Sequence, residues 1–187
     1  LNQVNETRDG QWPFAAIVSC MDSRTSAELI FDLGLGDIFS IRIAGNVISE
    51  NVLGSLEYSC KVAGSKLIVV LGHTRCGAVK GACDHVEMGN LTTLLNKIVP
   101  SMYYEKSITE NRNSSNNEFV NKVASIHVYR CVETIMEQSV ILRDMVMKEE
   151  IGVIGGLYNV ENGQVEFFED TWLSGEVHNV FEEFLIA

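Results

Sequence analysis

The sequence predicts an α/β fold in which a mostly parallel β-sheet is flanked by helices. Short apolar runs at residues 13–20, 37–43 and 66–72 have the length of buried strands, and a helical pattern at 49–62 separates the last two. Strands that alternate with helices form parallel sheets with covered faces. The 187 residues, of which 46% are hydrophobic, are expected to form a single domain spanning 1–187.

The predicted strands end in residues that carry chemistry. The first run ends at Cys20, and the third ends directly before His73. The segment 49–62 opens with Ser49, a typical helix N-cap, and its apolar residues recur at helical spacing. Ligands of parallel sheets bind at the carboxyl ends of the strands, so we expect Cys20 and His73 to lie close together.

The rest of the chain predicts further helices and a hairpin. The pattern after Cys76 is helical and is broken by one polar loop and, near Ser139, by a helix interruption. The turn-forming pair Asn162-Gly163 predicts a hairpin of two strands. The expected elements are helices at 78–89 and 91–102, a loop or helix cap at 111–117, a long helix at 118–148, and strands at 151–158 and 164–168.

Composition excludes several classes of partner and location. The 14 basic and 25 acidic side chains give a net charge of −11, which disfavours nucleic acid and anionic membranes as partners. No apolar run approaches the roughly 18 residues that span a bilayer, so a soluble protein is expected. Five cysteines in a chain of this length indicate thiols or metal ligands, which favours a reducing, cytoplasmic compartment. The chain opens with leucine, so a removed leader is also expected.

A zinc site is predicted from Cys20 together with His73 and Cys76. The His-x-x-Cys spacing places nitrogen and sulfur ligands close together, and the cysteine at a neighbouring strand end adds a third. Three protein ligands leave one position for water, which is typical of catalytic rather than structural zinc. Alone, the His-x-x-Cys motif more often marks a buried thiol near an unrelated histidine.

Asp22 and Arg24 favour the catalytic interpretation. A carboxylate beside a metal either binds it or accepts a hydrogen bond from a water on it. A guanidinium that holds both carboxylate oxygens would keep Asp22 away from the metal. Elsewhere in a chain such a pair would be an ordinary surface ion pair.

These residues fall in three motifs that resemble β-class carbonic anhydrases. The motifs are C-x-D-S-R at 20–24, IRIAGN at 41–46 and GHTRCGAV at 72–79, and the similarity runs from about Gln11 to Ala82.

The resemblance implies a β-carbonic anhydrase-like fold and a reaction. It implies one zinc ion per chain held by Cys20, His73 and Cys76, with Asp22 and Arg24 as the catalytic dyad. The implied reaction is the reversible hydration of carbon dioxide to bicarbonate.

The substrate pocket is also implied by the resemblance. Gln11, Phe39 and Tyr58 occupy positions that line the pocket in plant-type members, and Ile17 stands where the bicarbonate-inhibited subtype has tryptophan. The plant-type subtype with an open active site is therefore expected. In the family these pocket residues come from the neighbouring subunit, which implies a homodimer or a multiple of dimers.

Two further residues complete the implied pocket. Ala44 would border carbon dioxide together with the phenylalanine, and Gly77 would offer its backbone N–H to bicarbonate. Members of the family usually carry a helical arm before the pocket glutamine. Only ten residues precede it here, so we expect that arm to be missing.

Two other functions remain open at this point. The same scaffold could hydrolyse carbon disulfide or carbonyl sulfide, and a non-enzymatic module could use zinc only for folding, although such a site would have a fourth protein ligand. The remaining cysteines, Cys60, Cys83 and Cys131, are expected to be core residues. His127 and His178 are expected to be structural or surface residues rather than proton shuttles.

Overall fold

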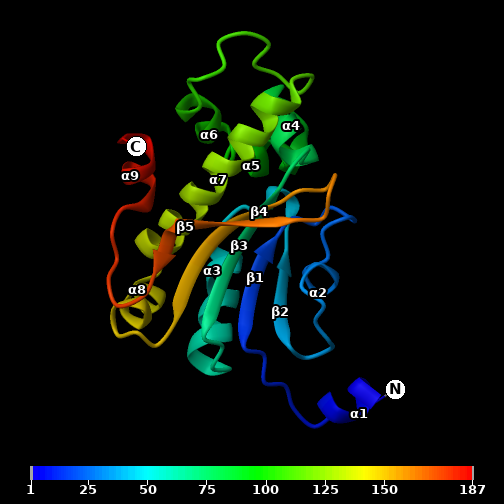
Figure 1. The fold of residues 1–187 in the computed structure, drawn as a ribbon, viewed down its shortest axis with the longest axis vertical. Helices are drawn as coiled ribbons and strands as arrows, with labels where there is room; N and C mark the ends of the chain where they lie inside the picture. Colours follow the sequence, from blue (N-terminus) through cyan, green and yellow to red (C-terminus); the bar gives the residue numbers. More distant parts are fainter. Residues whose placement is uncertain (1, 187) are drawn as a thin grey trace.

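The computed structural model describes residues 2–186 and contains a five-stranded sheet in the order β2-β1-β3-β4-β5 (Figure 1). Strands β1 to β4 run parallel, and β5 pairs antiparallel with β4. The predicted α/β fold with a mostly parallel sheet is confirmed. The strands are β1 (Ala15–Ser19), β2 (Ile38–Arg42), β3 (Leu67–His73), β4 (Gly152–Tyr158) and β5 (Val165–Leu173).

Helices lie on both sides of this sheet and at its ends. Figure 1 shows α1 apart from the sheet at the N-terminal end of the chain, and α9 beside α7 at the C-terminal end. The helices are α1 (Asn2–Thr7), α2 (Ala27–Ile30), α3 (Glu50–Glu57), α4 (Gly77–Cys83), α5 (Gly89–Leu95), α6 (Val99–Tyr104), α7 (Asn117–Gln138), α8 (Val140–Met147) and α9 (Val180–Ile186), with a 3-10 turn η1 (Ala44–Asn46) and a π-helical turn η2 (Tyr58–Val62).

The predicted break in the long helix is confirmed at Ser139. This residue ends α7 and caps α8, because its hydroxyl accepts the N–H of Leu142 at 3.2 Å. The same hydroxyl donates to the Glu57 carboxylate at 2.6 Å, which ties the break to the end of α3. A serine that satisfies exposed helix N–H groups in this way allows the chain to change direction.

Three predicted elements have different bounds in the structure. The helix expected at 78–89 ends at Cys83 as α4. The single helix expected at 91–102 is two helices, because Pro100 lies in the first turn of α6 and cannot continue α5. The strand expected at 164–168 extends to Leu173 as β5, since a bulge opposite Gly155 breaks the alternation. At the bulge the Thr171 hydroxyl accepts the N–H of Gly155 at 2.7 Å, so pairing resumes beyond it.

The core is divided by the alternation of side chains along the central strands. One face of β1 and β3, with Val18 and Val70, packs against α3, α7 and α8. The other face, with Ile17 and Val69, forms a smaller cluster under α2. Because both faces of these strands are buried, their sequences are continuous apolar runs rather than alternating ones.

Helix α7 approaches the sheet closely at two glycines. A Cβ placed on Gly72 would lie 2.7 Å from a methyl of Val128, and one on Gly155 would lie 2.6 Å from the other methyl. Val128 is fully buried. The two glycines therefore set the distance between α7 and strands β3 and β4, next to the residue that ends β3.

We expect Gly155→Ala to lower the free energy of unfolding by about 1–3 kcal/mol, because the added methyl overpacks Val128. Urea unfolding at pH 7 measures the change. Combining it with Val128→Ala makes room for the methyl, so the double variant should be more stable than the sum of the two single effects predicts. If the two changes in the free energy of unfolding were strictly additive, the close approach to Val128 would not be the cause of the destabilisation.

Candidate metal centre

Three metal-ligating side chains meet at the carboxyl edge of the sheet. Cys20 follows β1, His73 ends β3, and Cys76 is the N-cap residue of α4. One ligand atom of each lies within 4.8 Å of the others, and all three residues are buried. The sulfur atoms of Cys20 and Cys76 are 3.9 Å apart.

The imidazole of His73 presents a free nitrogen to this cluster. Its Nδ1 lies 2.9 Å from the carbonyl oxygen of Thr74. A carbonyl can only accept, so Nδ1 carries the proton and Nε2 carries a lone pair. Among residues 2–186, the buried Nε2 atom has no hydrogen-bond partner. A hydrogen bond at the far nitrogen that fixes the tautomer is typical of metal-binding histidines.

The donor set fits zinc. Two zinc–sulfur bonds of about 2.3 Å at tetrahedral angles place the sulfurs about 3.8 Å apart, close to the 3.9 Å between Cys20 and Cys76. Two thiolates and an imidazole are ligands that zinc prefers. The cluster is therefore consistent with the metal site expected from the sequence.

The environment of Cys20 favours its thiolate form. The pKa of the Cys20 thiol is lowered to about 4, first by the hydrogen bond with the Cys76 thiol and then, against the effect of burial, by His73 and two backbone N–H groups. Those N–H groups belong to Asp22 and Gly45, 3.4 and 3.3 Å from the sulfur. The neighbouring thiolate raises the pKa of the Cys76 thiol, so a cation is needed to hold both in the charged form.

The other three cysteines have no such environment. Cys60, Cys83 and Cys131 are buried, as expected from the sequence, and none is in a disulfide. Burial raises the pKa of Cys60 to about 11 and those of Cys83 and Cys131 to about 12. These three thiols stay protonated and behave as small core residues.

Asp22 and Arg24 form a two-pronged ion pair beside the cluster. The guanidinium donates from Nε and Nη2 to the two carboxylate oxygens at 2.9 and 2.8 Å, and the Arg24 backbone N–H donates to the first oxygen. These hydrogen bonds hold the pKa of the Asp22 carboxyl well below its usual range. The carboxylate oxygen Oδ2 lies 3.9 Å from the His73 Nε2 atom, so the charged group faces the cluster.

Two residues that the sequence analysis did not single out hold this loop in place. The Thr25 hydroxyl donates to the carbonyls of Cys20 and Asp22 at 3.1 and 3.0 Å. Arg42 at the end of β2 donates to the same two carbonyls. The IRIAGN motif contains this arginine, but only its pairing across the sheet shows what it does.

The remaining predicted site residues are divided between two places. Ala44 begins the turn that brings the Gly45 N–H to Cys20, and Gly77 begins α4 directly after Cys76. A Cβ on Gly77 would meet no atom within 4 Å, so its backbone borders open space. These two residues lie beside the cluster.

The three other pocket residues lie in hollows away from the cluster. Phe39 and Tyr58 stack edge to face, 6.1 Å between ring centres, and line a hollow of about 520 Å³ to which none of the three ligands contributes. Gln11 is exposed and lines a separate hollow beside Leu35. Within one chain the predicted pocket is therefore not assembled around the cluster.

His127 supports the candidate metal site through the turn at Gly45. The buried imidazole of this α7 residue has Nε2 3.0 Å from the carbonyl of Gly45, whose N–H faces the Cys20 sulfur. Its Nδ1 lies 3.4 Å from the Ser101 hydroxyl. The sequence expectation of a structural role agrees with these contacts.

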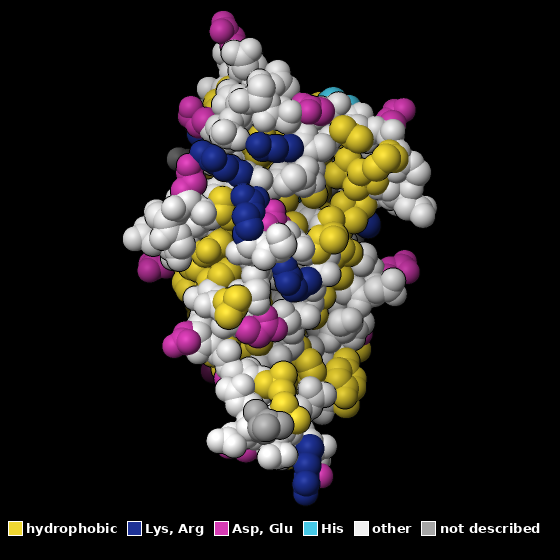
Figure 2. Space-filling view, turned by 90° about the vertical axis from the view of Figure 1, so that its right-hand side faces the viewer, with side chains coloured by type: hydrophobic (Ala, Val, Ile, Leu, Met, Phe, Trp, Pro, Cys, Tyr) yellow, Lys and Arg dark blue, Asp and Glu magenta, His cyan; other side chains and the backbone are white. Residues whose placement is uncertain are grey.

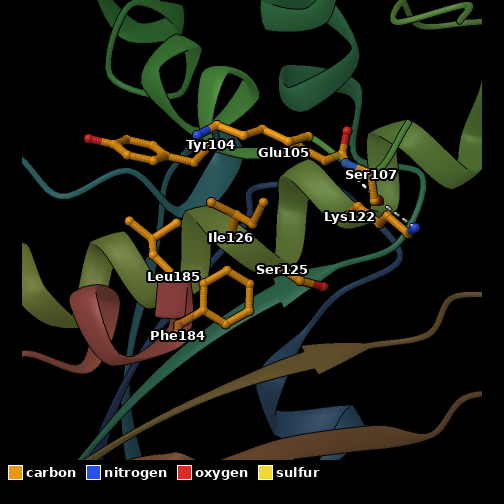
Figure 3. A pocket seen from close by; sticks show the side chains of 9 residues that line it. Tyr104, Glu105, Ser107, Lys122, Ser125, Ile126, Phe184 and Leu185 are labelled. Atoms are coloured by element: carbon orange, nitrogen blue, oxygen red, sulfur yellow. Dashed lines mark hydrogen bonds between the residues drawn. The ribbon is translucent and has the colours of Figure 1, made fainter. Parts of the chain in front are cut away.

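A further cavity, besides the two hollows described above, lies apart from the metal cluster. Its volume is about 570 Å³, and it is bounded by α7, α9 and the segment after α6 (Figure 3). Apolar side chains of Ile126, Phe184 and Leu185 form one side, and on the other the Lys122 amine donates to the Ser107 hydroxyl at 2.8 Å. None of the three metal-ligating residues lines it.

Among the described residues, no helix is long and apolar enough to cross a membrane.

Comparison with known proteins gives the same family throughout. The sequence model of the family described as carbonic anhydrase matches residues 15–165. Carbonic anhydrase 2 of Mycobacterium tuberculosis is 36% identical over 160 residues, which is 83% of this chain and 74% of the relative. The carbonic anhydrase of Mycolicibacterium smegmatis is 33% identical over 172 residues, 89% of this chain and 80% of the relative.

Solved structures of similar fold are also carbonic anhydrases. A β-carbonic anhydrase of Aspergillus fumigatus superposes with a TM-score of 0.81 at 23% identity, covering 98% of this chain and 86% of that one. A tetrameric β-carbonic anhydrase of Sordaria macrospora gives 0.78 at 22% identity, with 90% of each chain covered. At these identities the likeness concerns the fold.

The buried imidazole of His127 should make stability depend on pH. Burial, and next the charge of Arg130, lower the pKa of His127 to about 4 from about 6.5 in the unfolded chain. Between these values the unfolded state binds the proton and the folded state does not, so stability present above pH 6.5 is lost as the pH falls. The expected loss from this residue is about 2–3 kcal/mol between pH 7 and 4.5.

Urea unfolding at the two pH values checks this expectation. His127→Gln keeps a donor for Gly45 but does not titrate, so its loss over this range should be smaller by that amount. His178→Gln, which alters a partly exposed histidine before α9, is the matched control and should behave like the parent chain. Equal losses in all three proteins would contradict the assignment.

Proposed function

Because the chain belongs to the β class of the carbonic anhydrase family, its reaction is the reversible hydration of carbon dioxide, and we propose that Cys20, His73 and Cys76 hold one zinc ion for it. The observation that carries this proposal is the buried Nε2 of His73, which has no partner among the described residues and faces two thiols 3.9 Å apart. When bound, zinc would supply the charge that makes water a nucleophile near neutral pH.

In this proposal Asp22 orients the attacking water. Both of its oxygens are held by Arg24, and its depressed pKa keeps it ionised, and so an acceptor, near neutral pH. An acceptor that fixes the hydrogen of the nucleophile points its lone pair toward the carbon of the substrate. Arg24 also holds both oxygens of the carboxylate, which faces the cluster, so that Asp22 would not become a fourth ligand; this supports the open subtype suggested by Ile17.

Ala44 and Gly77 complete the side of the pocket that belongs to the same chain. The methyl of Ala44 offers apolar surface suited to carbon dioxide, and the N–H of Gly77, beside open space, would donate to bicarbonate. A backbone donor at this position favours the charged product without adding a titrating group.

We further propose that Gln11, Phe39 and Tyr58 complete the pocket of a partner subunit in a homodimer or a multiple of dimers. Tyr58 is 50% exposed and Trp12, beside Gln11, is 76% exposed. Figure 2 shows hydrophobic side chains at the surface on the side of the molecule that carries α2 and β2. Exposed aromatic groups of this kind are typical of subunit interfaces, and the tetrameric Sordaria relative supports assembly from several chains.

Arg24→Ala should lower the rate of carbon dioxide hydration by roughly 10²-fold while one zinc per chain stays bound. Without its two hydrogen bonds, Asp22 is free to turn toward the metal as a fourth ligand and displace water. Stopped-flow hydration with elemental analysis measures both quantities. Arg143→Ala, which removes an exposed arginine on α8, is the control and should leave both unchanged.

The same assay tests the function itself. Zinc-loaded parent protein should hydrate carbon dioxide, with carbonyl sulfide and carbon disulfide as far poorer substrates. Faster turnover of either sulfur compound would favour the alternative hydrolase. A near-normal hydration rate in the Arg24 variant would show that this residue is only a surface partner.

A mixing experiment tests the shared pocket. Asp22→Asn and Tyr58→Ala should each be nearly inactive, because one lacks the acceptor and the other a pocket wall. In a hybrid dimer, one site receives an intact Asp22 from one chain and an intact Tyr58 from the other. The hybrid dimer should therefore have half of the parent activity, and random exchange of equal amounts, which makes half of the dimers hybrids, should restore about a quarter of it. No recovery after subunit exchange would place both residues in one chain's own site, and Tyr103→Ala serves as an exposed-tyrosine control.

A further inference from the structure

A polar hollow of about 240 Å³ lies between α7 and the segment that joins α5 to α6. At about 30 Å³ per water, its volume corresponds to about eight water molecules. The side chains of Lys97 and Arg130 line it, together with the amides of Asn96 and Gln138. Within the described part of the chain no carboxylate lines it, although acidic residues outnumber basic ones by 25 to 14 in the sequence.

The charge of Arg130 is not neutralised by a carboxylate. Among residues 2–186, neither Arg130 nor Lys97 takes part in an ion pair. The Arg130 Nη1 atom donates to the Ser101 hydroxyl at a long 3.4 Å, and the guanidinium lies 5.9 and 5.8 Å from the ring centres of Tyr104 and Phe181. The rings attract the cation and the hydroxyl accepts from it, but none of them carries a negative charge to neutralise this partly buried group.

Glu133 is the acidic residue nearest to Arg130 along α7, and it does not fill this role. It does not line the hollow. Burial, and then the charge of Glu137, raise the pKa of its carboxyl, and the attraction of Arg130 does not overcome them. The carboxylate and the guanidinium are therefore not a tight pair.

The floor of the hollow adds no charge and no competing donor. The His127 imidazole donates its N–H to the Gly45 carbonyl and accepts from the Ser101 hydroxyl, so it is neutral. The Thr134 hydroxyl donates to the Arg130 carbonyl at 2.7 Å. The donors left for a ligand are a guanidinium, an ammonium and two amides, a set that matches a compact group of several acceptor oxygens.

We propose that this hollow binds one small oxyanion of the phosphate or sulfate kind, with Arg130 and Lys97 as the charged donors and Gln138 and Asn96 as neutral ones. The volume suits a free inorganic ion with a few waters. Residues 130, 134 and 138 recur every fourth position, so α7 presents them on one face toward the ion. The site is distinct from the metal cluster, from which the Gly45 turn and His127 separate it.

Calorimetric titration of the zinc-loaded protein with inorganic phosphate tests the proposal, with chloride holding the ionic strength constant. One ion per chain should bind at this site, and Arg130→Gln should weaken its binding at least tenfold. Lys97→Gln removes an exposed charge that folding does not need, so it keeps the test valid if the arginine variant fails to fold; it should also weaken binding. Lys106→Gln, an equal loss of charge beside the other cavity, should not.

Titration with other anions and the hydration assay distinguish an inorganic ion in this hollow from a phosphate ester and from phosphate at the metal. Sulfate should compete with phosphate, whereas tighter binding of glycerol phosphate would identify a phosphate ester rather than the free ion as the ligand and overturn the inorganic assignment. If phosphate bound at the metal instead of in the hollow, it would inhibit carbon dioxide hydration equally in all variants. Identical phosphate affinity in the Arg130, Lys97 and Lys106 variants, or crystals soaked in phosphate with the ion only at the metal cluster, would overturn the proposal.

Discussion

Two thiols and an imidazole nitrogen are buried together at the ends of β1 and β3, and the surrounding structure depends on neutralising them. Two thiolates 3.9 Å apart repel each other, and the buried Nε2 of His73 loses its hydration without a replacement from any described residue. A divalent cation removes both costs at once. Metal binding and folding are therefore coupled in this region, as in other sites where buried ligands must be deprotonated.

The ligands are positioned mainly by backbone groups. The N–H groups of Asp22 and Gly45 face the Cys20 sulfur, and the Thr74 carbonyl fixes the imidazole of His73. The Gly45 turn has a φ of 63°, which favours glycine, and a Cβ there would lie 2.6 Å from Ile98. Side chains farther out, such as His127, then hold these backbone groups in place. Replacing such a side chain is therefore expected to shift a ligand through the backbone that holds it.

Much of this arrangement could be predicted from the sequence because it follows from strand order. Parallel strands bring their carboxyl ends to one edge, so Cys20 and His73 were expected there, and the sheet order makes their strands β1 and β3 neighbours. Contacts between distant segments could not be read in this way. His127 and Gly45 are 82 residues apart, and nothing in the local pattern of either indicates the hydrogen bond between them. Short helices such as α2 were missed because four residues carry too little periodicity.

The two roles of charge at the site explain why Arg24 pairs with Asp22 and not with a ligand. Two thiolates already balance the two positive charges of a zinc ion, so such a site makes water less acidic than a site with three neutral histidines, where its pKa is about 7. A carboxylate bound to the metal as well would give it a net negative charge and take the position of the water. In the proposed site Arg24 would prevent this by holding both oxygens of Asp22, and the cost would be low because the Arg24 side chain is itself half exposed. In that proposal the ion pair would act on the charge and coordination of the metal, and its contribution to the stability of the fold would be secondary.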